Sequence, residues 1–265
     1  MNLRLCIYIL CSIVISIFPL HASTSALPLK NPIKKILLVV AMDTEAQPII
    51  NELHLHPLPH SFTNLPMRGY AGEQGNTKIL LIMNGEDPIN KVQNIGTQAA
   101  TLSTYLGVEY FHPDLIISIG TAGAVIENGV QLKDIIASKK IYFFDRRIPM
   151  DGYYNYGRGG YTSMSLTAID HQLNFKPGIV CSGDSFDEAE IDYKIFLKEH
   201  CSAIDMEAAG VAWVSMLTKT PMIAIKGITN FVRGKNIHAQ YKKNLPEVTI
   251  MLANKLKQLI HHLNT

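Results

Sequence analysis

Short, uninterrupted apolar runs alternate along this chain with helical stretches, and this alternation limits the fold more than any other feature. A strand that is apolar at every position must be covered on both faces, as in a parallel sheet flanked by helices. The pattern therefore predicts an α/β domain with a mainly parallel sheet. We expect strands over residues 36–41, 78–83, 115–119, 135–144, 179–182, 203–206 and 222–228, and helices over residues 44–53, 92–106, 187–200, 208–217 and 245–262.

The first residues follow a different pattern. Arg4 precedes an apolar run from Leu5 to Leu20, and Ala22 is a small residue suited to cleavage. The run falls short of the roughly 20 apolar residues that a spanning helix needs, so a signal peptide over residues 1–22 is favoured over a membrane anchor. We expect one domain over residues 33–265, a periplasmic or secreted location, and no membrane contact after cleavage.

The composition is that of a globular protein. Hydrophobic residues make up 47% of the 265 residues and charged residues 17%, and the net charge of +2 does not favour a nucleic-acid or acidic partner. Beyond the signal segment, which holds Cys6 and Cys11, two cysteines remain. Cys181 and Cys201 either form a disulfide or are two buried thiols, and their spacing does not predict a metal site.

Polar residues gather where the predicted strands end. Ligands of open α/β sheets bind beyond the carboxyl ends of the strands. These ends supply two carboxylates, an amide, a glycine-rich turn and an aromatic ring, in residues 41–45, 120–123, 182–186, 206–207 and 229–230. Each feature alone has an ordinary explanation, such as a capping glutamate or a simple turn. Their appearance at one sheet edge favours a binding site.

Several of these segments resemble the nucleoside phosphorylase superfamily, and within it the methylthioadenosine/S-adenosylhomocysteine nucleosidases. The matching segments are AMDTE (41–45), SIGTAGAV (118–125), SGDSFD (182–187), IDMEAAGVA (204–212) and KGITN (226–230), with FFDRRIP (143–149) similar to the plant-type subgroup. The resemblance implies a three-layer sandwich around a mixed, mainly parallel sheet. It also implies a homodimer, cleavage of the N-glycosidic bond of a purine nucleoside, and no cofactor or metal.

The resemblance assigns roles to individual residues. Glu45 matches the glutamate that positions or activates the attacking water, which the oxocarbenium-like transition state of glycosyl cleavage requires. Glu207 matches the carboxylate that accepts hydrogen bonds from the ribose hydroxyls. Further substrate contacts are expected from Met206 on the sugar face, Phe186 on the purine, a site formed by Thr121 and Gly123, and the strand-end residues Met42 and Thr229.

The nucleophile is expected to be water. A phosphorylase needs arginines or an anion-binding nest for phosphate. Here the loop after the first strand carries Asp43 and Glu45, and the loop over residues 84–88 is also acidic. We interpret the basic pair Arg146 and Arg147 as surface or dimer-contact residues.

Asn230 departs from the family pattern, because the nucleosidases have an aspartate there that protonates N7 of the departing adenine. An amide has no proton to give, and general acids typically contribute about 10² to 10⁴ in rate. Three readings stay open: a preference for 6-oxopurines, slow cleavage of methylthioadenosine-like substrates with help from a group such as Asp184 or Asp187, and nucleoside binding or storage without turnover. The 5′ group of the substrate is expected to meet residues 148–161, with Tyr153, Tyr154 and Tyr156, from a partner subunit.

Overall fold

The computed structural model describes residues 32–59, 62, 64–166 and 170–264. The predicted signal peptide, residues 1–22, lies outside the described residues. Within them, no helix combines the length and the apolar character that a membrane span requires.

Helices and strands alternate as the sequence predicted. The described strands are β1 (Lys35–Val40), β2 (His56–Leu58), β3 (Arg68–Gln74), β4 (Thr77–Met83), β5 (Leu115–Ala124), β6 (Ile135–Phe143), β7 (Gly159–Thr162), β8 (Lys176–Ser182), β9 (Cys201–Asp205) and β10 (Met222–Phe231). The helices are α1 (Asp43–Glu52), α2 (Thr97–Phe111), the 3-10 helix η1 (Ile126–Asn128), α3 (Tyr153–Arg158), α4 (Asp170–Leu173), α5 (Glu190–Lys198), α6 (Ala208–Thr218) and α7 (Ile237–Leu263). The sequence did not predict β2, β3, β7, α3 or α4.

The strands form one mixed sheet in the order β10-β6-β8-β9-β5-β1-β4-β3-β2, with β7 beside β6. Parallel pairs join β1 to β4 and β5, β5 to β10, and β8 to β6 and β9. Antiparallel pairs join β3 to β2 and β4, β6 to β7 and β10, and β5 to β9. The α/β class and the mixed sheet are confirmed, whereas "mainly parallel" understates the antiparallel pairing. Because β10 pairs with both β6 and β5, this half of the sheet closes into a ring.

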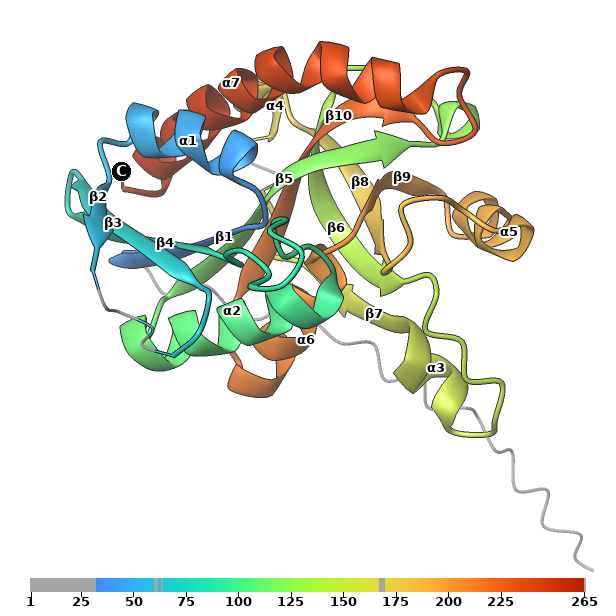
Figure 1. Cartoon of the computed structure of the whole chain (residues 1–265), viewed down its shortest axis with the longest axis horizontal. Coiled ribbons are helices and arrows are strands. Elements are labelled where there is room, and N and C mark those ends of the chain that lie inside the picture. Colours follow the sequence, from blue (N-terminus) through green and yellow to red (C-terminus); the bar gives the residue numbers. More distant parts are fainter. Residues whose placement is uncertain (1–31, 60–61, 63, 167–169, 265) are drawn as a thin grey trace, which may run out of the picture.

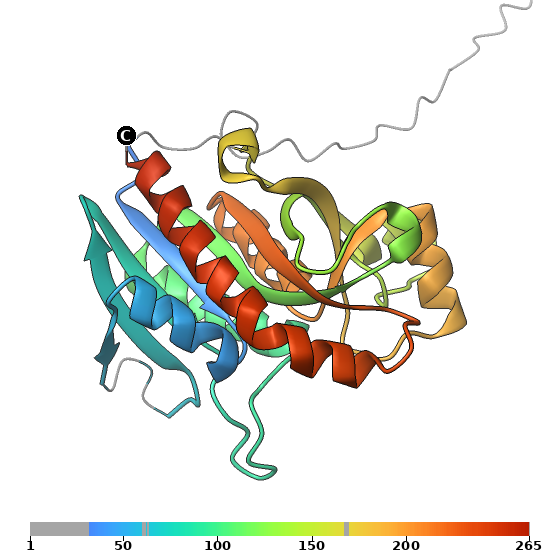
Figure 2. The same ribbon diagram turned by 90° about the horizontal axis from the view of Figure 1, so that it is seen from above.

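Helices cover both faces of the sheet (Figure 1 and Figure 2), which explains why its strands are apolar at every position. On β1, Ile36, Leu38 and Val40 pack in the cluster formed with α1 and α7. Leu37 and Val39 point the other way, into the cluster with α2 and α6. Alternate residues of a strand face opposite sides, so burial of both sides leaves no position for a polar residue.

Two strands run further than the sequence predicted. Thr229 and Asn230 were expected just beyond a strand, but both belong to β10, and the expected glycine-rich turn Gly120–Gly123 is part of β5. The reason is that β5 and β10 stay paired to their ends, with Asn230 opposite Gly123 after a bulge. A ladder satisfies backbone polar groups that would otherwise be buried without partners.

A disulfide joins β8 to β9 and settles the question of the two cysteines. Cys181 and Cys201 are bonded, with their Cα atoms 5.8 Å apart. Both are fully buried, in a small cluster with Phe144 and Phe196. The bond lies one residue before Ser182, where β8 ends, so it ties together two strands that lead toward the same edge of the sheet.

We expect reduction of this disulfide to lower the free energy of unfolding by about 3 kcal/mol, because it closes a loop with a sequence separation of 20 residues. Urea denaturation with and without dithiothreitol measures the difference. The double variant Cys181→Ala/Cys201→Ala is the control, and its midpoint should not respond to the reductant. Equal midpoints for the wild-type protein in both conditions would contradict the prediction.

Candidate active site

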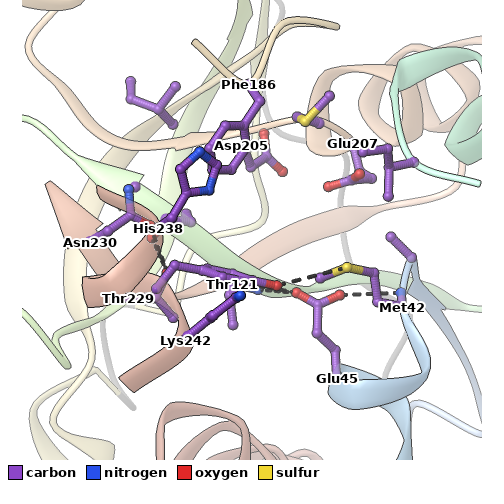
Figure 3. A pocket seen from close by; sticks show the side chains of 17 residues that line it. Met42, Glu45, Thr121, Phe186, Asp205, Glu207, Thr229, Asn230, His238 and Lys242 are labelled. Atoms are coloured by element: carbon purple, nitrogen blue, oxygen red, sulfur yellow. Dashed lines mark hydrogen bonds between the residues drawn. The ribbon is translucent and has the colours of Figure 1, made fainter. Parts of the chain in front are cut away.

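One cavity of about 350 Å³ lies at the ends of β1, β5, β9 and β10. Nine residues to which the sequence assigned a catalytic or substrate-binding role line it: Met42, Glu45, Thr121, Gly123, Phe186, Met206, Glu207, Thr229 and Asn230. Figure 3 shows that they divide into two ends, with Glu45, Met42 and Glu207 toward one end and Asn230 and Phe186 toward the other. These residues come from segments far apart in the sequence, and the sheet brings them together.

Glu45 is a buried carboxylate with both oxygens held in place. Thr121 donates to Oε1 from its backbone nitrogen and from its hydroxyl, each over 2.7 Å. The backbone nitrogen of Met42 donates to Oε2 over 3.3 Å, so Glu45 also caps the first turn of α1. A Cβ at position 120 would lie 3.0 Å from Oε1, so Gly120 permits this close approach. The carboxylate is therefore fixed before any ligand binds.

A buried ion pair supports the floor of the cavity. Lys226 Nζ on β10 lies 2.8 Å from Asp205 Oδ2 at the end of β9, and both side chains are buried. The same oxygen accepts the backbone N–H of Ala208, and Oδ1 accepts the hydroxyl of Ser182. Ser182 in turn accepts the backbone N–H of Ala209. These bonds fix the first turn of α6 relative to three strands.

Glu207 stands directly before α6 and is strongly affected by this environment. Its Oε1 accepts the backbone N–H of Gly96 over 3.2 Å. Burial raises the pKa of Glu207 to about 7; Lys226 lowers it, while Asp205 and Glu45 add to the rise. Burial would lower the pKa of Lys226, but Asp205, Glu207 and Glu45 raise it above its usual value. Near neutral pH, the cavity therefore contains a carboxyl group that changes charge readily.

The other end of the cavity is built around Asn230. Its Oδ1 accepts the hydroxyl of Thr229 over 2.9 Å, and the carbonyl of Thr229 accepts Nδ2 of Asn244. A Cβ at position 123 would lie 3.2 Å from Asn230 Nδ2, so Gly123 leaves room for the amide. The side chain is buried, and the amide is held by its neighbour with Nδ2 available as a donor.

Two rings close this end. Phe186 stacks on His238 with centroids 5.3 Å apart and planes inclined by 17°. Phe186 is 52% exposed, so the pair lies at the mouth of the cavity and its outer surface meets solvent. Flat apolar faces at this position suit a flat ligand.

Sequence analysis missed the contribution of α7. His238, Tyr241 and Lys242 line the cavity, but the predicted helix began at residue 245, after all three. Tyr241 Oη lies 3.8 Å from Met42 Sδ. Burial raises the pKa of Tyr241 to about 12, and the nearby Glu45 adds to the rise. The missed signal was the spacing of 238, 241 and 242, which places them on one helix face.

Other sequence candidates lie outside the cavity. Asp184 accepts hydrogen bonds from the backbone and hydroxyl of Thr97 and from Gln98, so it caps α2. Arg147 pairs with Asp192. The remaining candidates also lie away from the lining: Asp187, Arg146, Tyr153, Tyr154 and Tyr156.

The charges of the cavity do not suit a bound phosphate. Glu45, Asp205 and Glu207 are acidic lining residues against one lining lysine, Lys242, and the buried Lys226 beneath them is already paired with Asp205. Within the described residues, no group of three or more His, Cys, Asp or Glu side chains is arranged to hold a metal ion. The arrangement suits a neutral, partly apolar ligand with hydroxyl groups for the carboxylates and a flat ring for Phe186.

Comparisons with known proteins agree with this geometry. The sequence model of the phosphorylase superfamily matches residues 35–261. The 5'-methylthioadenosine/S-adenosylhomocysteine nucleosidase of Arabidopsis thaliana is 34% identical over 237 residues, covering 87% of this chain and 92% of the relative. The 5'-methylthioadenosine nucleosidase of the same plant is 31% identical, covering 88% and 89%. A solved apo structure of an Arabidopsis thaliana 5'-methylthioadenosine nucleosidase superposes with a TM-score of 0.86 at 30% identity, covering 88% and 97%.

The raised pKa of Glu207 predicts a pH-dependent stability. Between about pH 4.5 and 7, the folded state holds a proton that the unfolded state has lost, so this residue's contribution to stability falls as the pH rises. The slope is at most about 1.4 kcal/mol per pH unit. Urea unfolding from pH 4.5 to 8 should show that Glu207→Gln lacks this decline. Parallel curves for the wild-type protein and the variant would contradict the prediction.

Proposed function

The chain belongs to the phosphorylase superfamily, and we propose that it is a purine nucleosidase that hydrolyses the N-glycosidic bond of 5'-methylthioadenosine-like nucleosides. Relatives at 31–34% identity over most of the chain carry this activity in their names. The resemblance seen in the sequence is thereby confirmed. The observation that carries the proposal is that Glu45, Glu207, Phe186 and Asn230 all face one cavity.

Glu45 and Glu207 would act on the sugar. The two ribose hydroxyls donate to the carboxylate of Glu207, which places C1′ near Glu45. Glu45, held by Thr121 and Met42, positions a water molecule for attack on C1′ as the base departs. Because Glu45 is held before the substrate arrives, little reorganisation is needed at the reacting centre.

Water is favoured over phosphate as the nucleophile. A phosphate beside Glu45 would meet the carboxylates of the cavity, while Lys226 is already engaged by Asp205. Arg68, which lies close in space to the start of α1, pairs with Asp43 instead of facing the cavity. Like charges in a poorly solvated site are costly, so a phosphate ion is disfavoured there.

Phe186 and Asn230 would hold the base. The purine stacks on Phe186, and the amide of Asn230 meets the edge that carries N7 and the 6-substituent. Nδ2 can donate to the oxygen of a 6-oxopurine, and Oδ1 keeps a second lone pair for the 6-amino group of adenine. The Nδ2 donor is the feature that supports a 6-oxopurine nucleosidase as the second candidate function, whereas the Oδ1 lone pair is compatible with adenine.

We also propose an exported homodimer. Export to the periplasm or outside the cell is supported by the disulfide, because such bonds persist in oxidising compartments. The segment with α3 projects from the body of the molecule (Figure 1) and exposes Met150, Tyr153, Tyr154 and Tyr156. In the proposed dimer, this segment reaches the partner's cavity on the side of the substrate's 5′ group. The domain over residues 33–265 would be the mature unit.

The proposal is tested by incubating the mature protein with methylthioadenosine, adenosine, inosine and guanosine, each with and without phosphate. We expect release of free base, measured by chromatography, and we expect this release to be the same with and without phosphate. Glu45→Gln should abolish most of it, whereas Glu52→Gln, the same change at the far end of α1, should not. Base release only in the presence of phosphate would contradict the hydrolytic assignment.

Asn230→Asp should raise adenine release from methylthioadenosine, because a protonated carboxyl can give the departing base a proton and an amide cannot; the gain reaches about 100-fold where no other group protonates the base and is smaller where one does. Steady-state kcat and KM for both proteins measure the gain. Asn51→Asp, the same substitution at an exposed position of α1, is the matched control. An unchanged kcat in the Asn230 variant would mean that this residue does not occupy the position of a general acid.

A further inference from the structure

The proposed hydrolysis leaves one requirement unmet. A purine leaves the sugar far more easily as a neutral molecule than as an anion, so a proton must reach the base as the bond breaks. Asn230 faces the base end of the cavity but has no proton to give. Some other group must act there, or the reaction would be slow.

Most other titratable side chains in or near the cavity are not suited to protonate the base. Asp205 is paired with Lys226 and bonded to Ala208. Glu45 and Glu207 lie toward the end of the cavity opposite Asn230 (Figure 3). Tyr241, with a pKa of about 12, holds its proton too tightly to be a good acid near neutral pH. Asp184, which lies outside the cavity, is bonded to the first turn of α2.

His238 is placed differently. It lines the cavity from the first turn of α7, on the same side as Asn230 and Phe186 (Figure 3). Its ring lies nearly parallel to Phe186, the residue proposed to stack on the purine. Imidazole is the side chain that enzymes use most often as a general acid or base.

We propose that His238 is the proton donor to the departing base, a catalytic role that rests on the proposed nucleosidase function. The bond between C1′ and N9 breaks, and its electron pair stays on the base. His238 gives its proton to N7 of the base, and the water oxygen forms the new bond to C1′. The proton of that water passes to Glu45. Solvent then takes the proton from Glu45 and returns one to His238, so the cycle closes without another reactant.

The position of His238 at the mouth of the cavity supports this cycle. The residue is exposed, so it can regain a proton from solvent after each turnover. Tyr241 and Lys242, three and four residues further along α7, are titratable groups of the same helix that also line the cavity. In this cycle Asn230 recognises the purine by hydrogen bonding to its edge, while the proton comes from His238 on α7.

The experiment compares two kinds of leaving group. His238→Gln should lower kcat for nucleoside hydrolysis by about 100-fold, the lower end of the usual contribution of a general acid. It should change hydrolysis of p-nitrophenyl β-D-ribofuranoside only a few-fold, because nitrophenolate is a stable anion that leaves without a proton. His261→Gln makes the same change at the far end of α7 and should leave both activities unchanged.

A double-variant cycle gives an independent readout. If Asp at position 230 can supply the proton, His238→Gln should cost much less in the Asn230→Asp background than in the wild-type protein. Such non-additivity is expected when two groups can perform the same step. A purely structural role of His238 would cost the same in both backgrounds.

The outcomes separate this inference from the function on which it rests. Equal losses on both leaving groups, or full nucleoside hydrolysis by His238→Gln, would overturn the role of His238 while the nucleosidase function stands. No turnover of nucleosides or of the nitrophenyl riboside by the wild-type protein would overturn both.

Discussion

The buried ion pair between Lys226 and Asp205 is the interaction on which the site depends. It joins β10 to β9 beneath the cavity. The oxygens of Asp205 also accept hydrogen bonds from the backbone N–H of Ala208 and from the hydroxyl of Ser182. Removing one partner of such a pair typically costs about 3–5 kcal/mol, because the other charge is left buried and alone. A fully bonded pair avoids that cost and fixes the directions of its neighbours. The proposed ribose carboxylate, Glu207, follows β9 directly, so the pair sets both its position and part of its electrostatic environment.

The closure of half the sheet into a ring extends this effect to the other functional side chains. Beyond residues 225–227, which pair with β6 as well, β10 stays paired with β5 as far as Phe231, so its last residues stay in the sheet and do not emerge as a loop. Asn230 therefore lies on a strand opposite Gly123, and the hydroxyl of the adjacent Thr229 donates a hydrogen bond to its side-chain Oδ1. Side chains on paired strands are positioned more accurately than side chains on loops. The cavity is thus built on paired strands on one side, and its lining residues Phe186 and His238 are exposed.

The sequence predicted the strand side of the site well and the helix side poorly. Residues at the carboxyl ends of buried strands must lie at one edge of the sheet, and this rule placed residues as distant as Glu45 and Asn230 in one cavity. The early start of α7 was missed, because Pro246 suits the first turn of a helix and the residues before it are largely polar. The ring was missed as well, since the antiparallel pairing of β6 with β10 is a long-range contact that no local pattern records. The first reason hid His238, and the length of β10 was missed because its pairing with β5 as far as Phe231 is also a long-range contact.

Asn230 shows how the fold and the chemistry can change separately at one position. An amide and a carboxylate have the same shape, and either accepts the hydroxyl of Thr229, so the packing around β10 does not distinguish them. Only the carboxyl group can carry a proton to the base. A protonated carboxyl group therefore fits the packing that holds the amide, and the difference between the two is decisive for the reaction unless another group supplies the proton. The cavity places an imidazole on the same side, on an element that the strand pattern does not constrain. Since α7 packs on β10 through residues such as Val248 and Leu252, its first turns are free to vary without loss of the core. The position of His238 on such a turn is what allows the base-binding residue and the proton donor to be different residues.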